Sequence, residues 1–202
     1  TVRALLVHSA QWTSQMKAQF CSDDSKKTGR RRLLRTCGYG IPDIDRAIQC
    51  LNNSVNLIIQ GEIQPYEKKD GRIGMKEMHL HQIPWPTELL QRLGAIEVEM
   101  RVTLSYFIEP GPGEKGWNNR YRYPSCGLRF DVINTDETVE DFKKRINIKM
   151  REDGDDHGEG TSGSNRWYLG SENRDVGSIH SDFIKTSAVE LCNANYLAVY
   201  PV

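Results

Sequence analysis

The sequence has no long apolar run and no excess of either charge. Its 202 residues include 27 basic and 27 acidic side chains, so the formal net charge at pH 7 is zero. A membrane-spanning helix needs about 18 mostly apolar residues in a row, and polyanion-binding domains usually carry a basic excess. We therefore expect a globular protein that binds neither membrane nor nucleic acid, with a core that a chain of this length can form.

Cysteine is scarce and its spacing forms no recognisable motif. The chain has an odd number of cysteines and no C-x-x-C pair. This pattern argues against a disulfide framework or a zinc site, and it predicts reduced thiols in a cytoplasmic protein without a cofactor. Neither an initiator methionine nor a signal peptide is visible, so we expect a piece of a longer protein. The cysteines are Cys21, Cys37, Cys50, Cys126 and Cys192.

Residues 1–53 have helical periodicity with a basic interruption. Residues 1–20 place apolar side chains mainly on one face, which predicts a helix. Residues 21–36 are rich in lysine and arginine, and we expect a surface loop there. A patch for nucleic acid or an acidic partner is the alternative, but no aromatic residues are interleaved to stack on bases. Pro42 then suits the first turn of a second helix that ends near residue 53.

From residue 54 the apolar period changes to two, which is typical of strands with one buried face. The spacing predicts six to nine strands joined by long loops, with short helices at 85–94 and 138–146. We therefore expect a mainly β chain: an antiparallel β-sandwich at 54–202, of jelly-roll or fibronectin-like topology, after a helical segment at 1–53. The expected strands are SVNLIIQGEIQ, GMKEMHLHQIPWP, AIEVEMRVTLSYFIEP, GLRFDVI, NRWYLG, SDFIKTSAVEL and NYLAVYPV.

Three short motifs suggest chemistry but lack necessary partners. His79 and His81 lie on one face of an expected strand, at a spacing that zinc or copper can use, but no third ligand is near in sequence. A calcium-type loop beginning at Asp153 has Ser164 where the bidentate glutamate belongs. Ser162 follows Gly-Thr as in a protease nucleophile motif, yet no base or fixed helix accompanies it. We expect no metal ion and no catalytic residue in this chain.

The Gly-Tyr-Gly stretch at 38–40 is not a convincing phosphate-binding loop. A dinucleotide-binding loop follows a strand and reads G-x-G-x-x-G, with an acidic residue about twenty positions later. Here a basic segment precedes the glycines, and Asp43 stands at the third glycine position. The stretch is better interpreted as a turn that positions the following helix.

Two stretches together resemble the end of a subtilisin-like serine protease domain. In those enzymes the helix that carries the catalytic serine is followed by a helix like TVRALLVHSAQW, a variable loop, and a Gly-x-Gly turn into a last short helix like CGYGIPDIDRAIQ. The resemblance implies that the family's catalytic Asp, His and Ser motifs all lie upstream of Thr1. No catalytic residue is carried over, because His8, Ser9, Asp43 and Asp45 do not stand in those motifs.

The remaining 150 residues resemble the β-sandwich that follows the catalytic domain in some bacterial subtilases. The MRVTLSYFIEP strand and the C-terminal stretches carry this similarity. WNNRYRYPSCGLRFDV is similar to a bacterial subtilase subgroup encoded beside AAA-type ATPases, which implies such an ATPase as a possible partner. The resemblance thus implies an inactive C-terminal fragment of a subtilisin-like endopeptidase, whose sandwich serves stability or recognition.

Two expectations concern interactions of the fragment. The alternative function is a non-catalytic module that binds a protein partner or carbohydrate through aromatic and arginine side chains, the residue types that dominate binding hot spots. The apolar stripe of the first helix should pack on the sandwich, on the second helix, or on another copy of the chain, which allows a homo-oligomer. The candidate binding residues are Trp85, Trp117, Arg120, Tyr121 and Tyr123.

Overall fold

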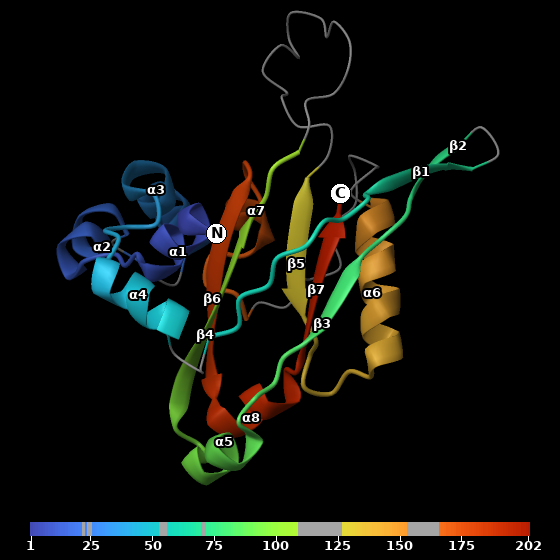
Figure 1. Cartoon of the computed structure of the whole chain (residues 1–202). Coiled ribbons are helices and arrows are strands. Elements are labelled where there is room, and N and C mark those ends of the chain that lie inside the picture. Colours follow the sequence, from blue (N-terminus) through green and yellow to red (C-terminus); the bar gives the residue numbers. More distant parts are fainter. Residues whose placement is uncertain (22, 24–25, 53–55, 70–71, 109–126, 153–165) are drawn as a thin grey trace, which may run out of the picture.

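The computed structural model describes residues 1–21, 23, 26–52, 56–69, 72–108, 127–152 and 166–202 (Figure 1). Every strand pair in this part of the chain is antiparallel. The elements are α1 (Val2–Ser9), α2 (Ser14–Phe20), α3 (Lys27–Cys37), α4 (Ile44–Asn52), β1 (Tyr66–Lys69), β2 (Arg72–Met75), β3 (His79–Gln82), α5 (Thr87–Leu93), β4 (Glu97–Ser105), β5 (Leu128–Val132), α6 (Val139–Glu152), α7 (Ser171–Arg174), β6 (Ile179–Ser187), α8 (Ala188–Asn193) and β7 (Tyr196–Pro201).

The fold class is mixed α/β, so the expectation of a mainly β chain is wrong. The strands form a β1–β2 hairpin, a three-stranded sheet of order β3–β7–β5, and a β4–β6 pair. A jelly-roll or fibronectin-like sandwich is not confirmed by this arrangement. Figure 1 shows α1–α4 gathered on one side of β4 and β6, and α6 beside the β3–β7–β5 sheet.

Two of the expected elements in the N-terminal segment are wrong. The helix expected at 1–20 is divided into α1 and α2, because Gln11 leaves the helix to bridge Ile41 and Thr13 then caps α2 by accepting a hydrogen bond from Met16 N. The basic stretch expected as a loop forms α3. Arginine and leucine favour helix, and the completely buried Leu33 anchors this one to the protein.

The longest expected strand is confirmed as β4, which pairs with β6 from Glu97↔Ser187 to Ser105↔Ile179. The strand expected at 54–64 is wrong, because residues 56–65 form no strand. Leu57, Ile58 and Ile59 are exposed to a similar extent, so this stretch lacks the alternating burial that a half-buried strand requires.

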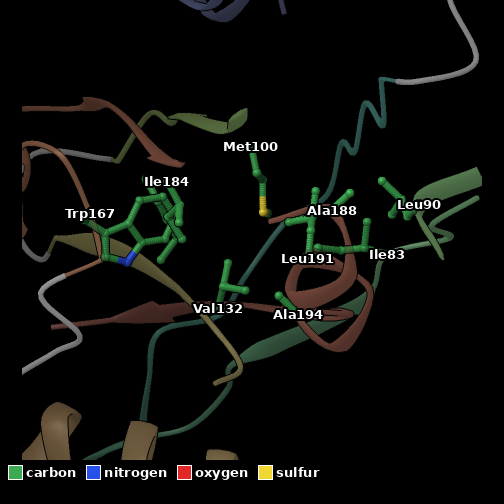
Figure 2. Packing of buried hydrophobic residues seen from close by; sticks show 10 residues of the cluster. Ile83, Leu90, Met100, Val132, Trp167, Ile184, Ala188, Leu191 and Ala194 are labelled. Carbon is green, nitrogen blue, oxygen red and sulfur yellow. The ribbon is translucent and has the colours of Figure 1, made fainter. Parts of the chain in front are cut away.

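Two apolar clusters hold the elements together. One lies between the β4–β6 pair and the β3–β7–β5 sheet, and Figure 2 shows Met100, Val132, Trp167 and Ile184 converging there with α8 side chains beside them. The second lies between the three-stranded sheet and α6. The expected helix at 138–146 is thereby confirmed, and it begins where Thr138 Oγ1 accepts a hydrogen bond from Asp141 N at 3.2 Å. Of the helices described, none combines the length and apolarity that crossing a membrane requires.

Candidate functional site

The two stretches that carry the protease resemblance are joined directly in the structure. Gln11 N donates to Ile41 O at 3.0 Å, and Ile41 N donates to Gln11 O at 2.9 Å. Gly40, with φ of 96°, brings the turn so close that a Cβ atom on it would lie 2.2 Å from Gln11 O. A side chain at this position is therefore excluded both by backbone conformation and by space. Asp43 N also donates to Ser9 Oγ at 3.2 Å, so α1 and the start of α4 form one unit.

Arg3 fastens α1 to the ends of β4 and β6. Its Nε donates to Ser105 Oγ at 2.9 Å, and its Nη2 donates to Tyr106 O at 2.8 Å and to Ser178 O at 2.7 Å. The guanidinium also lies over the Phe107 ring, 4.7 Å from its centroid. One side chain thus links three segments that are distant in sequence.

A second link runs from His8 into the β4–β6 pair. His8 Nδ1 lies 3.0 Å from Thr103 Oγ1, which lies 2.8 Å from Ser181 Oγ. Burial, with the Arg101 charge acting in the same direction, lowers the pKa of His8 to about 4. The imidazole is therefore neutral at pH 7. Arg101 Nη1 donates to Ala10 O at 2.9 Å and adds a further contact between β4 and the end of α1.

α3 and the turn after it complete the contact with β6. Tyr39 OH donates to Ile179 O at 3.0 Å, and burial raises the pKa of this phenol. Arg30 Nη1 donates to Tyr168 O at 2.5 Å while its guanidinium lies 4.6 Å from the Tyr168 ring centroid. Arg3, His8 and Tyr39 form what we call the polar clamp between residues 1–53 and the β4–β6 pair, and Arg30 adds a contact to Tyr168.

The polar residues of α1 form no catalytic triad. Ser9 is fully buried, and its hydroxyl donates to Leu6 O at 3.0 Å and accepts from Asp43 N. The neighbouring His8 is directed instead at Thr103. A serine nucleophile needs a base within hydrogen-bond reach. Ser9 instead bonds to main-chain atoms of Leu6 and Asp43, and His8 contacts the Thr103 hydroxyl. Their geometry is that of a packed interface.

A buried charge network lies on the other side of the core, around Asp131 on β5. Its Oδ2 accepts from Arg145 Nη1 at 2.7 Å and from Lys149 Nζ at 2.6 Å, while Trp167 Nε1 donates to Oδ1 at 3.2 Å. Burial alone would raise the pKa of Asp131, but Lys149 and Arg145 lower it to about 2. The carboxylate therefore stays ionised and fixes α6 to the sheet.

A second buried network centres on Arg174 at the end of α7. Its Nε donates to Asp175 Oδ1 at 2.7 Å, its Nη2 donates to Phe130 O at 3.1 Å, and the guanidinium lies 4.1 Å from the Phe130 ring centroid. Asp182 accepts from Leu169 N at 2.8 Å and from Gly170 N at 3.0 Å. Arg174 Nη1 also lies 3.8 Å from Asp182 Oδ2 on β6, so Arg174 bridges β5 and β6. The alternation of apolar and polar residues along an expected strand does not identify buried charges such as Asp131 and Asp182, because it assigns every polar position to the solvent face.

The candidate binding residues are only partly placed by the structure. Trp85 is half-buried against the core, and its Nε1 donates to Ala194 O at 2.9 Å, so part of its surface is already occupied. Trp117, Arg120, Tyr121 and Tyr123 lie outside the described residues, as do Ser162 and the loop beginning at Asp153.

Exposed apolar side chains gather in the N-terminal part of the chain. Nine of the fifteen large apolar residues that are exposed in the described structure lie within residues 1–59. Val2 is 72% exposed and Ile44 is 71% exposed, although helices α1 and α4 pack against each other. Large exposed apolar surface on a soluble fold usually marks an interaction site. We call the following set the apolar helix surface: Val2, Leu6, Ile44, Ile48 and Leu51.

Comparisons with protein-family models, with curated proteins and with solved structures found no match to this chain.

Proposed function

We propose that this chain is the C-terminal part of a subtilisin-like serine endopeptidase. Residues 1–53 would be the closing helices of its catalytic domain, and residues 54–202 an accessory domain. The observation that carries the proposal is the direct pairing of Gln11 with Ile41. This pairing joins the two stretches whose order and amino-acid sequence resemble the end of that protease domain.

The apolar helix surface supports the same proposal. Ile44, Ile48 and Leu51 follow the spacing of a one-sided helix, and a helix at the edge of a larger domain buries such a stripe. Here the stripe is exposed. Each side chain of this size contributes roughly 1.5–3 kcal/mol when it is fully buried. The remainder of the catalytic domain is the partner that we assign to this surface.

The polar clamp supports an accessory role in stability. Arg3, His8 and Tyr39 tie the helical segment to β4 and β6 through hydrogen bonds with long sequence separations. Residues 54–202 would thereby hold the last helices of the catalytic domain in place. The peptide bond would be cleaved by acyl transfer through Ser, His and Asp, which the resemblance assigns to motifs upstream of Thr1.

The proposal is tested by exposing this chain to a fluorophosphonate probe and to an unstructured protein substrate. We expect no labelled serine and no cleavage, because no serine–base pair is present among the described residues. Ser162→Ala provides the matched variant, since Ser162 follows Gly-Thr in the sequence. Cleavage or labelling that disappears in Ser162→Ala would overturn the assignment and place the nucleophile within this chain.

A further inference from the structure

His79 and His81 form a pair of imidazoles on the edge strand β3. They lie opposite Val199 and Leu197 of β7, on the same face of the sheet. Their ring centroids are 5.8 Å apart and the rings are nearly perpendicular, at 82°. Met78 and Leu80 pack on the other face, against the α6 cluster. The alternation of the strand therefore fixes both imidazoles on one side.

Neither imidazole of this pair makes a hydrogen bond within the part of the chain that the structure describes. The other two histidines there behave differently, since His8 Nδ1 meets Thr103 Oγ1 at 3.0 Å and His180 Nε2 lies 3.1 Å from Gly177 O. Both His79 and His81 are half-buried. The two rings are thus held 5.8 Å apart, measured between their centroids, and no hydrogen bond to a described residue occupies either of them.

The segment before β1 approaches the same pair. A Cβ atom on Gly61 would lie 3.8 Å from His79 Cε1, so this backbone passes beside the ring. Gln64 N donates to Glu77 Oε2 at 3.2 Å, and Lys76 Nζ lies 3.4 Å from Glu77 Oε1. Because its carboxylate is already engaged, Glu77 is not counted as a ligand.

We propose that His79 and His81 chelate one divalent transition-metal ion, with copper(II) bound most strongly and nickel(II) and zinc(II) less strongly. Imidazole nitrogen is a preferred ligand of these ions, and affinity for a given nitrogen site peaks at copper. The described residues contain no group of three or more His, Cys, Asp or Glu that is arranged around a metal position. Two imidazoles therefore supply the protein ligands, and water or a small ligand completes the coordination. Binding would stiffen the edge of the β3–β7–β5 sheet.

The test is copper(II) titration of the intact chain, followed by pulsed electron paramagnetic resonance, which counts coordinated imidazoles through their remote nitrogens. We expect one ion per chain and a two-imidazole signal. His79→Gln and His81→Gln should each leave one imidazole and weaken binding roughly tenfold or more, because the second ligand acts at high effective concentration. Nickel(II) calorimetry on the same proteins provides the affinity without redox chemistry at the cysteines.

His157→Gln is the matched control, since it removes a histidine that the proposal does not use. It should bind copper as the unchanged chain does. Thermal unfolding without metal checks that each variant is folded, and added copper should raise the melting temperature only where both histidines remain. A two-imidazole signal that survives in the His79→Gln/His81→Gln double variant would overturn the proposal, as would equal weakening by His157→Gln or no binding by the unchanged chain.

Discussion

Replacing Gly40 with alanine tests the pairing on which the proposed function rests. A new Cβ atom would lie 2.2 Å from Gln11 O, 2.4 Å from Gln11 C and 2.7 Å from Trp12 N. All three are backbone atoms, so no side chain can rotate away to make room. The turn can accept alanine only by moving off Gln11, which breaks both hydrogen bonds between Gln11 and Ile41.

Gly38 provides the matched control two residues earlier. Its φ is 57°, and a Cβ atom there would meet nothing within 4 Å. Alanine at either position incurs a left-handed backbone cost of about 1–3 kcal/mol. Only Gly40→Ala also loses two main-chain hydrogen bonds, at about 1 kcal/mol each. We therefore expect Gly40→Ala to lower the free energy of unfolding by about 2 kcal/mol more than Gly38→Ala does.

The measurement is urea unfolding of both variants, followed by circular dichroism at equal protein concentration. In a domain of this size, that difference corresponds to a melting temperature about 4–8 °C lower for Gly40→Ala than for Gly38→Ala. Equal destabilisation by the two substitutions would refute the close approach of the turn to Gln11, and with it the structural support for the resemblance.

Three further predictions concern charge and exposed surface. The pKa of His8 in the folded protein is about 4, below its ordinary value of 6.5. As pH falls, His8 is therefore protonated in the unfolded state before it is protonated in the folded state. Stability should fall by about 3 kcal/mol as pH drops from 6.5 to 4, and His8→Asn should flatten that part of a urea-midpoint profile. Asp131→Asn removes the partner of two cations and should destabilise by about 3 kcal/mol in the same assay at pH 7; a change under 1 kcal/mol would contradict the network. The double variant Ile44→Ser/Ile48→Ser should reduce binding of a hydrophobic dye without lowering the melting temperature, because both side chains are exposed; a clear loss of stability would show that they are buried.

Local patterns predict part of this fold well. The alternation in 96–108 predicts β4, and Thr138 with Asp141 predicts the start of α6, because both signals arise from neighbouring residues. The division between α1 and α2 depends on Gln11 meeting Ile41, which is thirty positions away. The periodicity of apolar residues within a short stretch carries no information about a contact between residues so far apart in sequence. The apolar run at Leu57–Ile59 has strand composition but forms no strand in the structure.

The candidate site shows the same division between local and distant information. The sequence places His79 and His81 on one face, since strand alternation is a local property. It does not predict that Arg3 would reach Ser105 and Ser178, or that Arg174 would lie between two sheets, because such contacts depend on how distant strands are placed. Buried charges of this kind are found only once the fold brings their partners together.

The most direct test of the central proposal is fluorophosphonate labelling of the protein translated from the complete reading frame that contains this chain. Peptide mapping would then locate the modified serine. The proposal predicts one labelled serine upstream of Thr1, within a Gly-Thr-Ser-x-Ala-x-Pro stretch, and its loss when that serine is changed to alanine. Absence of any labelled serine upstream of Thr1, in a protein shown to be folded, would contradict it.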